Sequence, residues 1–121
     1  MKIGELSHLT GVSVRSLRHY EKKGLIASVR LPNGYRDYSP LTTETVDTIK
    51  LYLNLGLTTE QIAAFLTCVL KNKEAFCAEV LPVYRKKLAD IEHQLKQLDQ
   101  IKTNLIDRIN SLQQEEQVKN E

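Results

Sequence analysis

The chain has 121 residues, of which 26% are charged and 6% aromatic, and its formal net charge is +2. This length allows one compact domain with an extension, and the composition is typical of soluble helical proteins. No apolar run could span a bilayer, and Met1 leads almost directly into a helical pattern without a signal sequence. We therefore expect a cytoplasmic protein without a membrane partner.

Two short helices joined by a tight turn are predicted at the start of the chain. Apolar residues at three-residue spacing from Ile3 to Leu9 favour a first helix that ends at Gly11. Ser13 suits the N-cap of a second helix over 14–23. This pattern predicts a helix-turn-helix. Its small shared core would consist of Leu6, Val12, Leu17 and Tyr20.

A β-hairpin, or wing, is predicted after the second helix. Segments 26–30 and 35–38 have strand character and are separated by Leu-Pro-Asn-Gly. Asn33-Gly34 is a strong signal for a two-residue turn, because a primed turn needs a positive φ at both positions.

Two further helices complete the N-terminal part. Ser39 and Pro40 form an N-cap followed by proline at the first helical position, and the third helix should end at Gly56. The sequence over 58–61, Thr-Thr-Glu-Gln, is a capping box that opens a fourth helix reaching about Leu70.

From residue 81 the apolar positions alternate at spacings of three and four, which is a heptad pattern. No Gly or Pro follows Pro82, so 81–112 should form one helix of about 48 Å. Four short helices cannot cover so long an apolar face, and we expect a second copy of the chain to cover it. The expected dimerisation residues are Leu81, Tyr84, Leu88, Ile91, Leu95, Leu98, Leu105, Ile109 and Leu112, with Lys102 at one core-type position.

The predicted fold class is mainly α, with a winged helix-turn-helix DNA-binding domain followed by a long coiled-coil dimerisation helix. The expected divisions are a DNA-binding domain over 1–70, a connector over 71–80, the coiled coil over 81–112 and a polar, frayed tail over 113–121.

Positive charge is concentrated on the second helix and the wing. Between Val14 and Arg36 lie six cationic side chains against one anionic one, Glu21, whereas residues 41–121 hold ten basic and twelve acidic residues. A solvated charged surface is the plain alternative, but these cations lie on a helix-turn-helix. Such a local excess suits a phosphate backbone, so double-stranded DNA is the expected partner.

Four motifs in this region carry a family resemblance. They are Ser-Leu-Arg-His-Tyr-Glu over 16–21, Gly24-Leu25, Asn-Gly-Tyr-Arg-Asp-Tyr over 33–38 and Leu-Gly-Leu-Thr over 55–58. Together they resemble the MerR family of bacterial transcription regulators, over residues 1 to about 70. The sequence departs from the family pattern at His19, where Tyr or Phe is usual, and at Asp37, where an apolar residue is commoner. It also lacks a proline between Leu25 and Arg30.

The resemblance implies a homodimer with antiparallel coiled-coil helices, bound to a pseudo-palindromic operator between widely spaced promoter elements. Such regulators distort the DNA and so align these elements for RNA polymerase. By the same resemblance, Arg15 and Ser16 would read base edges, and Arg18 and Tyr20 would hold phosphates, as would Arg30, Tyr35 and Arg36 of the wing. The full expected set of DNA-binding residues is Ser13, Arg15, Ser16, Arg18, His19, Tyr20, Arg30, Asn33, Gly34, Tyr35, Arg36 and Tyr38.

Cys68 and Cys77 leave several interpretations open. In a reducing compartment two cysteines are expected to be thiols, not a structural disulfide. They could be buried packing residues, a sensor of oxidants or electrophiles, ligands of a metal, or part of another small-molecule site. Metal-sensing members of the resembling family carry ligand cysteines at and beyond the end of the dimerisation helix, but here no Cys or His follows Leu112. We expect no cofactor and no metal site.

The predicted function is a DNA-binding transcription regulator, and a response to a thiol-reactive or small-molecule signal is one interpretation of its cysteines. The alternative is a repressor or adaptor that has no ligand of its own. An enzyme is not expected, because the sequence has no Gly-rich phosphate loop, no Ser/His/Asp arrangement and no strongly spaced metal-ligand cluster.

Overall fold

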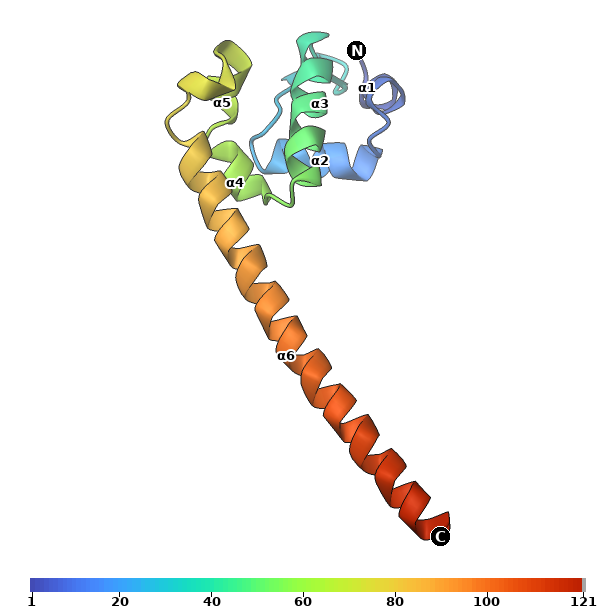
Figure 1. Ribbon diagram of the computed structural model, residues 1–121. Helices are drawn as coiled ribbons and strands as arrows, with labels where there is room; N and C mark the ends of the chain where they lie inside the picture. Colours follow the sequence, from blue (N-terminus) through green and yellow to red (C-terminus); the bar gives the residue numbers. More distant parts are fainter. Residues whose placement is uncertain (121) are drawn as a thin grey trace. The chain divides into compact units, whose positions relative to one another are not determined.

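The computed structural model describes residues 1–120, which form two compact units that divide between Val83 and Tyr84. The first unit holds a helix-turn-helix, a two-stranded wing and three further short helices; the second is the greater part of one long helix (Figure 1). The mainly helical fold with a wing and a long C-terminal helix confirms the predicted fold class. The elements in order are α1 (Ile3–Thr10), α2 (Val14–Lys22), β1 (Val29–Arg30), β2 (Arg36–Asp37), α3 (Leu41–Asn54), α4 (Thr59–Ala63), α5 (Leu66–Lys71), the 3-10 turn η1 (Glu74–Phe76) and α6 (Val80–Asn120).

The first two helices form as their end signals predict. Gly11 adopts a left-handed conformation with φ of 73°, and its N–H donates to the Ser7 carbonyl, which ends α1. The Ser13 hydroxyl accepts the Ser16 N–H at 3.1 Å and so caps α2. All four residues of the predicted shared core are buried, namely Leu6, Val12, Leu17 and Tyr20.

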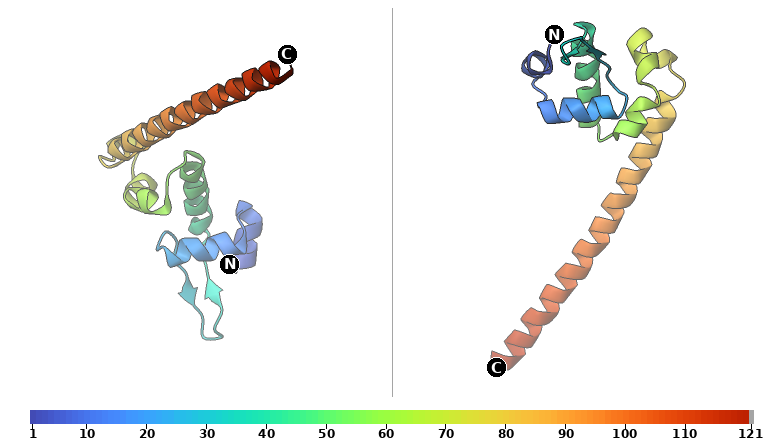
Figure 2. Two further views of the ribbon diagram at one scale, coloured as in Figure 1. Left: turned by 90° about the horizontal axis from the view of Figure 1, so that it is seen from below. Right: turned by 180° about the vertical axis from the view of Figure 1, so that it is seen from behind.

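The wing is a short antiparallel hairpin that protrudes from the helices (Figure 2). Val29 pairs with Asp37 and Arg30 with Arg36, so the strands are shorter than predicted and the loop covers residues 31–35. The segment before β1 supplies the core, because Leu25 and Ile26 are buried.

The predicted two-residue turn with positive φ at Asn33 and Gly34 is wrong. Gly34 alone of the pair has a positive φ, of 87°, and its N–H donates to the Leu31 carbonyl at 2.9 Å. Pro32 explains the difference, since its fixed φ suits the second position of an ordinary four-residue turn over 31–34. Asn33 instead accepts the Tyr35 N–H through its side-chain oxygen at 3.1 Å.

Helices α3, α4 and α5 complete the first unit. The capping box is confirmed: Thr58 accepts the Gln61 N–H, and the Gln61 side chain accepts the Thr58 N–H. The predicted single fourth helix is interrupted, because α4 ends at Ala63 and α5 begins at Leu66. Phe65 lies at the break with its ring buried, 4.9 Å from the Tyr52 ring in an edge-on contact. We attribute the break to this packing, since no Gly or Pro interrupts the segment.

Cys68 and Cys77 are joined by a disulfide, so the prediction of two thiols is wrong for this structure. The chain turns back through Asn72 and η1, which brings the two Cα atoms to 5.9 Å across nine residues of sequence. A sequence without a recognisable turn motif does not reveal this approach. The predicted polar connector is therefore a closed loop that lies within the first unit.

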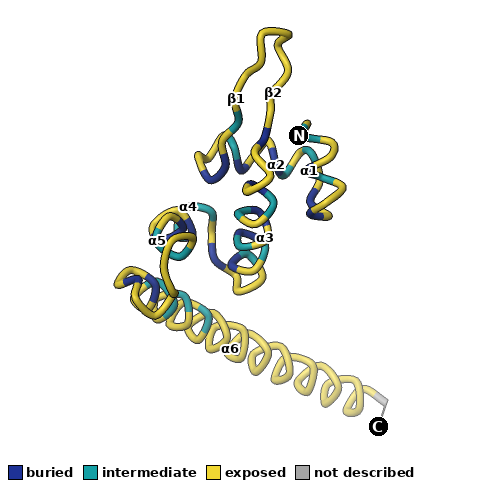
Figure 3. The backbone as a smooth tube through the Cα atoms, turned by 90° about the horizontal axis from the view of Figure 1, so that it is seen from above, coloured by how far each residue is buried: buried dark blue, intermediate teal, exposed yellow. Residues whose placement is uncertain are grey.

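Helix α6 runs without interruption from Val80 to Asn120, a length of about 60 Å. The polar segment after Leu112 continues this helix to Asn120, and Glu121 lies outside the described residues. Burial is confined to the start of α6, and the remainder is exposed (Figure 3). Within residues 1–120, no helix combines the length and apolar character needed to cross a membrane.

Candidate nucleic-acid interface

Helix α2 presents cationic side chains to solvent from a well-fixed backbone. Leu17 and Tyr20 bury one face of α2, which leaves Arg15, Arg18 and His19 exposed on the other. The N-terminal turn is held by the Ser13 cap, and the Ser13 hydroxyl also donates to the Ser16 hydroxyl at 3.0 Å. In helix-turn-helix proteins that bind DNA, the corresponding end of the second helix meets base edges in the major groove.

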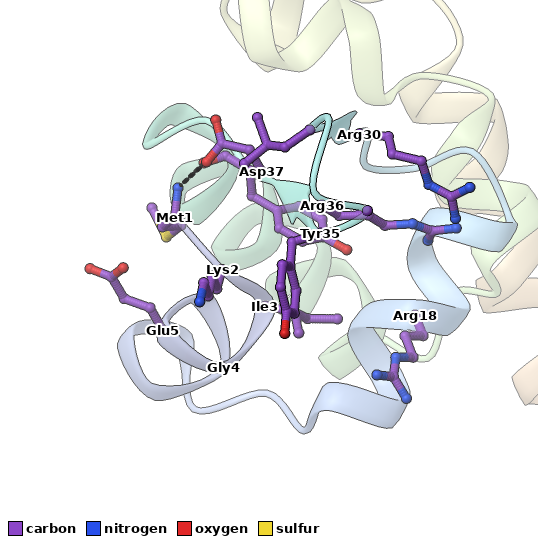
Figure 4. Close-up of a pocket in the computed structure, with 13 residues that line it drawn as sticks. Met1, Lys2, Ile3, Gly4, Glu5, Arg18, Arg30, Tyr35, Arg36 and Asp37 are labelled. Carbon is purple, nitrogen blue, oxygen red and sulfur yellow. Dashed lines mark hydrogen bonds and ion pairs between the residues drawn. The ribbon is translucent and has the colours of Figure 1, made fainter.

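A groove of about 1070 Å³ lies between the start of α1, α2 and the wing (Figure 4). Arg18 of α2 and Arg30 and Arg36 of the wing line it, so three guanidinium groups from separate elements meet at one surface. Tyr35 lines the same groove, and the Lys2 ammonium lies 4.8 Å from the centre of its ring. Such a concentration of guanidinium groups suits phosphate oxygens, which guanidinium binds with two hydrogen bonds.

Glu21 of α2 anchors the wing from inside the same surface. Its carboxylate accepts hydrogen bonds from Arg36 and, at 2.6 Å, from the Tyr38 hydroxyl. Tyr38 is fully buried, and burial, followed by the neighbouring Glu21 carboxylate, raises the pKa of its hydroxyl. The single acidic residue among the six cations is therefore the group that joins the second strand of the wing to α2.

The second strand of the wing is also tied to the start of the chain. The Met1 α-ammonium contacts the Asp37 carboxylate at 2.7 Å and donates to the Tyr38 carbonyl at 2.8 Å. In return, the Tyr38 N–H donates to the Met1 carbonyl at 2.8 Å. Asp37, which departs from the pattern of the resembling family, thus has an ion-pair partner in this chain.

The cationic residues of this interface differ in whether they already form an ion pair within the protein; those that form none are called uncommitted. Among residues 1–120, Arg15, Arg18 and Arg30 are exposed and form no ion pair with a carboxylate. Arg36 is paired with Glu21, and Lys23 with Glu60 at 3.1 Å. The three uncommitted arginines are the ones best able to receive a negatively charged ligand.

Two of the expected DNA-binding residues lie in the core. Tyr20 is 7% exposed and Tyr38 has no exposed surface, so both residues are buried in this structure. Tyr35 is exposed, and Asn33 and Gly34 lie at the exposed tip of the wing. The structural role of Glu21 was not predicted; the signal for it in the sequence is its isolation among six cations.

The predicted dimerisation residues form an uncovered apolar surface on α6. Tyr84 and Ile91 are half-buried, whereas the other seven are between 47% and 62% exposed. Ile101 and Ile106 are also exposed on this helix and add apolar surface that the heptad pattern omitted.

Within residues 1–120, no group of three or more His, Cys, Asp or Glu side chains is placed so that it could hold a metal ion. The two cysteine sulfur atoms are bonded to each other.

Comparisons with known proteins agree with this arrangement. Residues 2–38 match the model of the MerR family regulatory protein, and residues 43–108 match the model described as MerR, DNA binding. The mercuric resistance operon regulatory protein of Bacillus cereus is 35% identical over 107 residues, which cover 88% of this chain and 80% of that protein. The HTH-type transcriptional regulator HmrR of Rhizobium leguminosarum bv. viciae is 30% identical over 105 residues, covering 87% and 81% of the two chains.

Two solved structures of transcription regulators are similar in fold to this chain. The transcription regulator PbrR691 from Ralstonia metallidurans CH34, in complex with lead(II), has a TM-score of 0.76 at 25% identity, covering 88% of this chain and 83% of that one. HiNmlR, a MerR family regulator lacking the sensor domain and bound to promoter DNA, has a TM-score of 0.57 at 20% identity, with coverages of 83% and 76%. With two family models covering most of its length, this chain belongs to the MerR family of DNA-binding transcription regulators.

Proposed function

We propose that this protein is a homodimeric regulator that binds a pseudo-palindromic operator and distorts the promoter between the elements that RNA polymerase recognises. The observation that carries the proposal is the trio of uncommitted arginines, Arg15, Arg18 and Arg30, on the helix-turn-helix and wing. Acting on chromosomal DNA, the protein would work in the cytoplasm.

The three arginines divide between base reading and phosphate binding. Arg15 lies in the first turn of α2, where a recognition helix meets base edges, and we assign it that role together with Ser16. Arg18 and Arg30 line the groove beside the wing and are assigned to phosphates. Tyr38 is assigned a positioning role, because its buried hydroxyl holds Glu21.

Dimerisation through α6 follows from its uncovered apolar surface. Each large apolar side chain contributes about 1.5–3 kcal/mol when it is fully buried, so the exposed residues of α6 favour burial against another helix. We propose the antiparallel pairing of the family for this helix. Two DNA-binding units would then meet two half-sites, as the symmetry of a palindromic operator requires.

Distortion of the DNA would bring the polymerase recognition elements into line. A thiol-reactive signal at Cys68 and Cys77 would control this distortion. Support for the signal comes from the position of the disulfide, which joins α5 to the residues immediately before α6.

The experiment is in vitro transcription from a promoter recovered by selecting genomic DNA fragments on the purified protein. The protein should increase transcription by RNA polymerase from the native promoter. It should fail to do so from a matched promoter whose spacer has been shortened to the ordinary length. Equal activation of both promoters would contradict distortion, and repression of the native promoter under all redox conditions would favour a repressor without a ligand.

A further inference from the structure

The two cysteines of the Cys68–Cys77 disulfide differ in exposure. Cys68, in α5, is half-buried, whereas Cys77, immediately after η1, is 4% exposed. A small reagent in solution can therefore approach Cys68 more readily than Cys77.

The polar groups that face the two sulfur atoms also differ. The side-chain nitrogen of Asn72 lies 3.8 Å from the Cys68 sulfur and is held there by donating to the Cys68 carbonyl at 3.3 Å. The Cys77 sulfur lies 3.7 Å from the Lys73 carbonyl oxygen. An N–H donor stabilises a thiolate, whereas a carbonyl oxygen favours a protonated thiol that can donate to it. After reduction, Cys68 is thus the better placed of the two to be the nucleophile.

Hydrogen bonds that do not involve the sulfur atoms also hold the loop between the two cysteines. The Asn72 N–H donates to the Cys68 carbonyl at 2.8 Å, and the Cys77 N–H donates to the Glu74 carbonyl at 3.0 Å. The Tyr52 hydroxyl of α3 donates to the Glu74 carboxylate at 3.2 Å, which fixes the middle of the loop. These bonds restrict how far the loop can open when the disulfide is reduced, which favours re-formation of the bond.

From this asymmetry we propose that Cys68 and Cys77 form a reversible redox site, in which Cys68 reacts with a hydroperoxide and Cys77 resolves the product. The Cys68 thiolate attacks an oxygen of the hydroperoxide, the O–O bond breaks, and the sulfur is oxidised to a sulfenic acid. The released alkoxide takes up a proton and leaves as the alcohol.

The second step closes the disulfide. The Cys77 sulfur attacks the Cys68 sulfur, the S–S bond forms, the S–O bond breaks, and the hydroxyl group leaves with the Cys77 proton as water. Two equivalents of a low-molecular-weight thiol reverse the oxidation, regenerating both cysteines and yielding the disulfide of that thiol.

Hydrogen bonds join the loop that contains this site to α3 and to the start of α6. The Cys77 carbonyl accepts the N–H of Val80, the first residue of α6, at 3.2 Å, and Glu74 is held by α3 as described. A change in the redox state would therefore act on the loop that leads into the dimerisation helix. Its effect on transcription rests on the proposed function, whereas the thiol chemistry can be tested without DNA.

The experiment follows thiol loss in purified protein that has been reduced with dithiothreitol, freed of reductant and treated with hydrogen peroxide. In the wild type both thiols should disappear together and the disulfide should form within one chain. Cys77→Ser should accumulate a sulfenic acid that dimedone traps at Cys68, whereas Cys68→Ser should yield no adduct on the same timescale. Circular dichroism checks that both variants fold.

Two further variants keep the wild-type cysteines, so they test the proposal even if the serine variants fold poorly. Asn72→Ala should slow oxidation by removing the donor beside Cys68, while Lys73→Ala should oxidise at the wild-type rate, because only the Lys73 backbone carbonyl faces sulfur. A dimedone adduct on Cys77 in Cys68→Ser that forms as fast as the adduct on Cys68 in Cys77→Ser would overturn the assignment. Disulfides formed only between chains would overturn the site itself. Normal thiol oxidation with no change in transcription would instead contradict the proposed signal and leave this chemistry intact.

Discussion

The Tyr38 hydroxyl donates a 2.6 Å hydrogen bond to the Glu21 carboxylate, which joins the buried end of the wing to helix α2. The same carboxylate binds Arg36, so one acidic side chain holds both a residue of β2 and the residue that directly follows this strand. The angle at which the wing meets α2 therefore depends on a residue that is not itself expected to contact DNA.

Replacing Tyr38 with Phe should lower the free energy of unfolding by about 1.5–3 kcal/mol, the usual contribution of a hydrogen bond to a charged group. The ring would still fill its buried site, so the loss can be ascribed to the hydroxyl. Denaturant unfolding of the two proteins measures the difference. Tyr35→Phe is the matched control: its side chain is exposed, and it should unfold like the wild type. Equal stability of Tyr38→Phe and the wild type would contradict the anchoring role.

The wild type should lose stability at alkaline pH through Tyr38. Because burial and Glu21 raise the pKa of this hydroxyl above its ordinary value of 10.0, the folded state favours the protonated form. This contribution is fully present below the unfolded pKa of about 10 and is lost as the pH rises through the folded pKa. Unfolding free energies measured across this range should fall less steeply in Tyr38→Phe than in the wild type. Parallel curves would show that Tyr38 does not contribute.

Arg15 and Arg30 should have separable effects on DNA binding. Arg15→Ala should cost about 1–3 kcal/mol on the specific site and relax the sequence preference, as expected for a residue that reads a base. Arg30→Ala should weaken specific and non-specific binding alike and reduce the salt slope by about one, as expected for a phosphate contact. Mobility shifts over a range of salt concentrations measure both quantities. A changed sequence preference in Arg30→Ala with an unchanged slope would refute its assignment.

Arg36→Ala provides a comparison within the wing. Since Arg36 is paired with Glu21, its replacement should reduce stability and change the salt slope less than Arg30→Ala does. If the two variants had the same salt slope and wild-type stability, the distinction between committed and uncommitted arginines would fail.

Reduction of the disulfide should destabilise the protein by about 2.5–3 kcal/mol, because it releases a closed loop of ten residues in the unfolded chain. Unfolding with and without dithiothreitol measures the effect. The double variant Cys68→Ser and Cys77→Ser should unfold identically under both conditions. A wild type insensitive to dithiothreitol would mean that the bond does not form in the purified protein.

Charged residues introduced into the apolar face of α6 should prevent two chains from forming a dimer. Replacing both Ile91 and Leu98 with Asp should abolish the dimer and operator binding together, since each substitution would bury a carboxylate in an apolar interface. Analytical ultracentrifugation measures the assembly state. Lys96→Asp, outside the predicted apolar face, is the control and should remain dimeric; a wild type that is monomeric at micromolar concentration would contradict the proposal.

Local signals in the sequence predicted the elements that depend on local interactions. Gly11, Ser13 and the capping box at Thr58 mark helix ends through their own backbone and side-chain bonds, and the structure follows them. The errors occur where distant contacts decide the outcome. Packing of Phe65 on Tyr52 divides the predicted fourth helix, and backbone turns after α5 bring Cys77 to Cys68.

In the candidate site, too, features that depend on local sequence were predicted and features that depend on distant contacts were not. Charge and spacing indicated Arg15, Arg18 and Arg30, because a cluster of cations on a helix-turn-helix is visible in the sequence. The burial of Tyr38 and the pairing of Arg36 with Glu21 depend on how the wing folds back on α2, which no local pattern encodes.

The central claim is that two copies of this chain bind one symmetric operator inside a promoter. The most direct measurement is a footprint on the selected promoter fragment, combined with the protein-to-DNA stoichiometry from sedimentation. We predict two protected half-sites related by twofold symmetry, lying between the polymerase recognition elements, with two chains bound per fragment. One chain bound to an asymmetric sequence, or protection outside the promoter, would contradict this account.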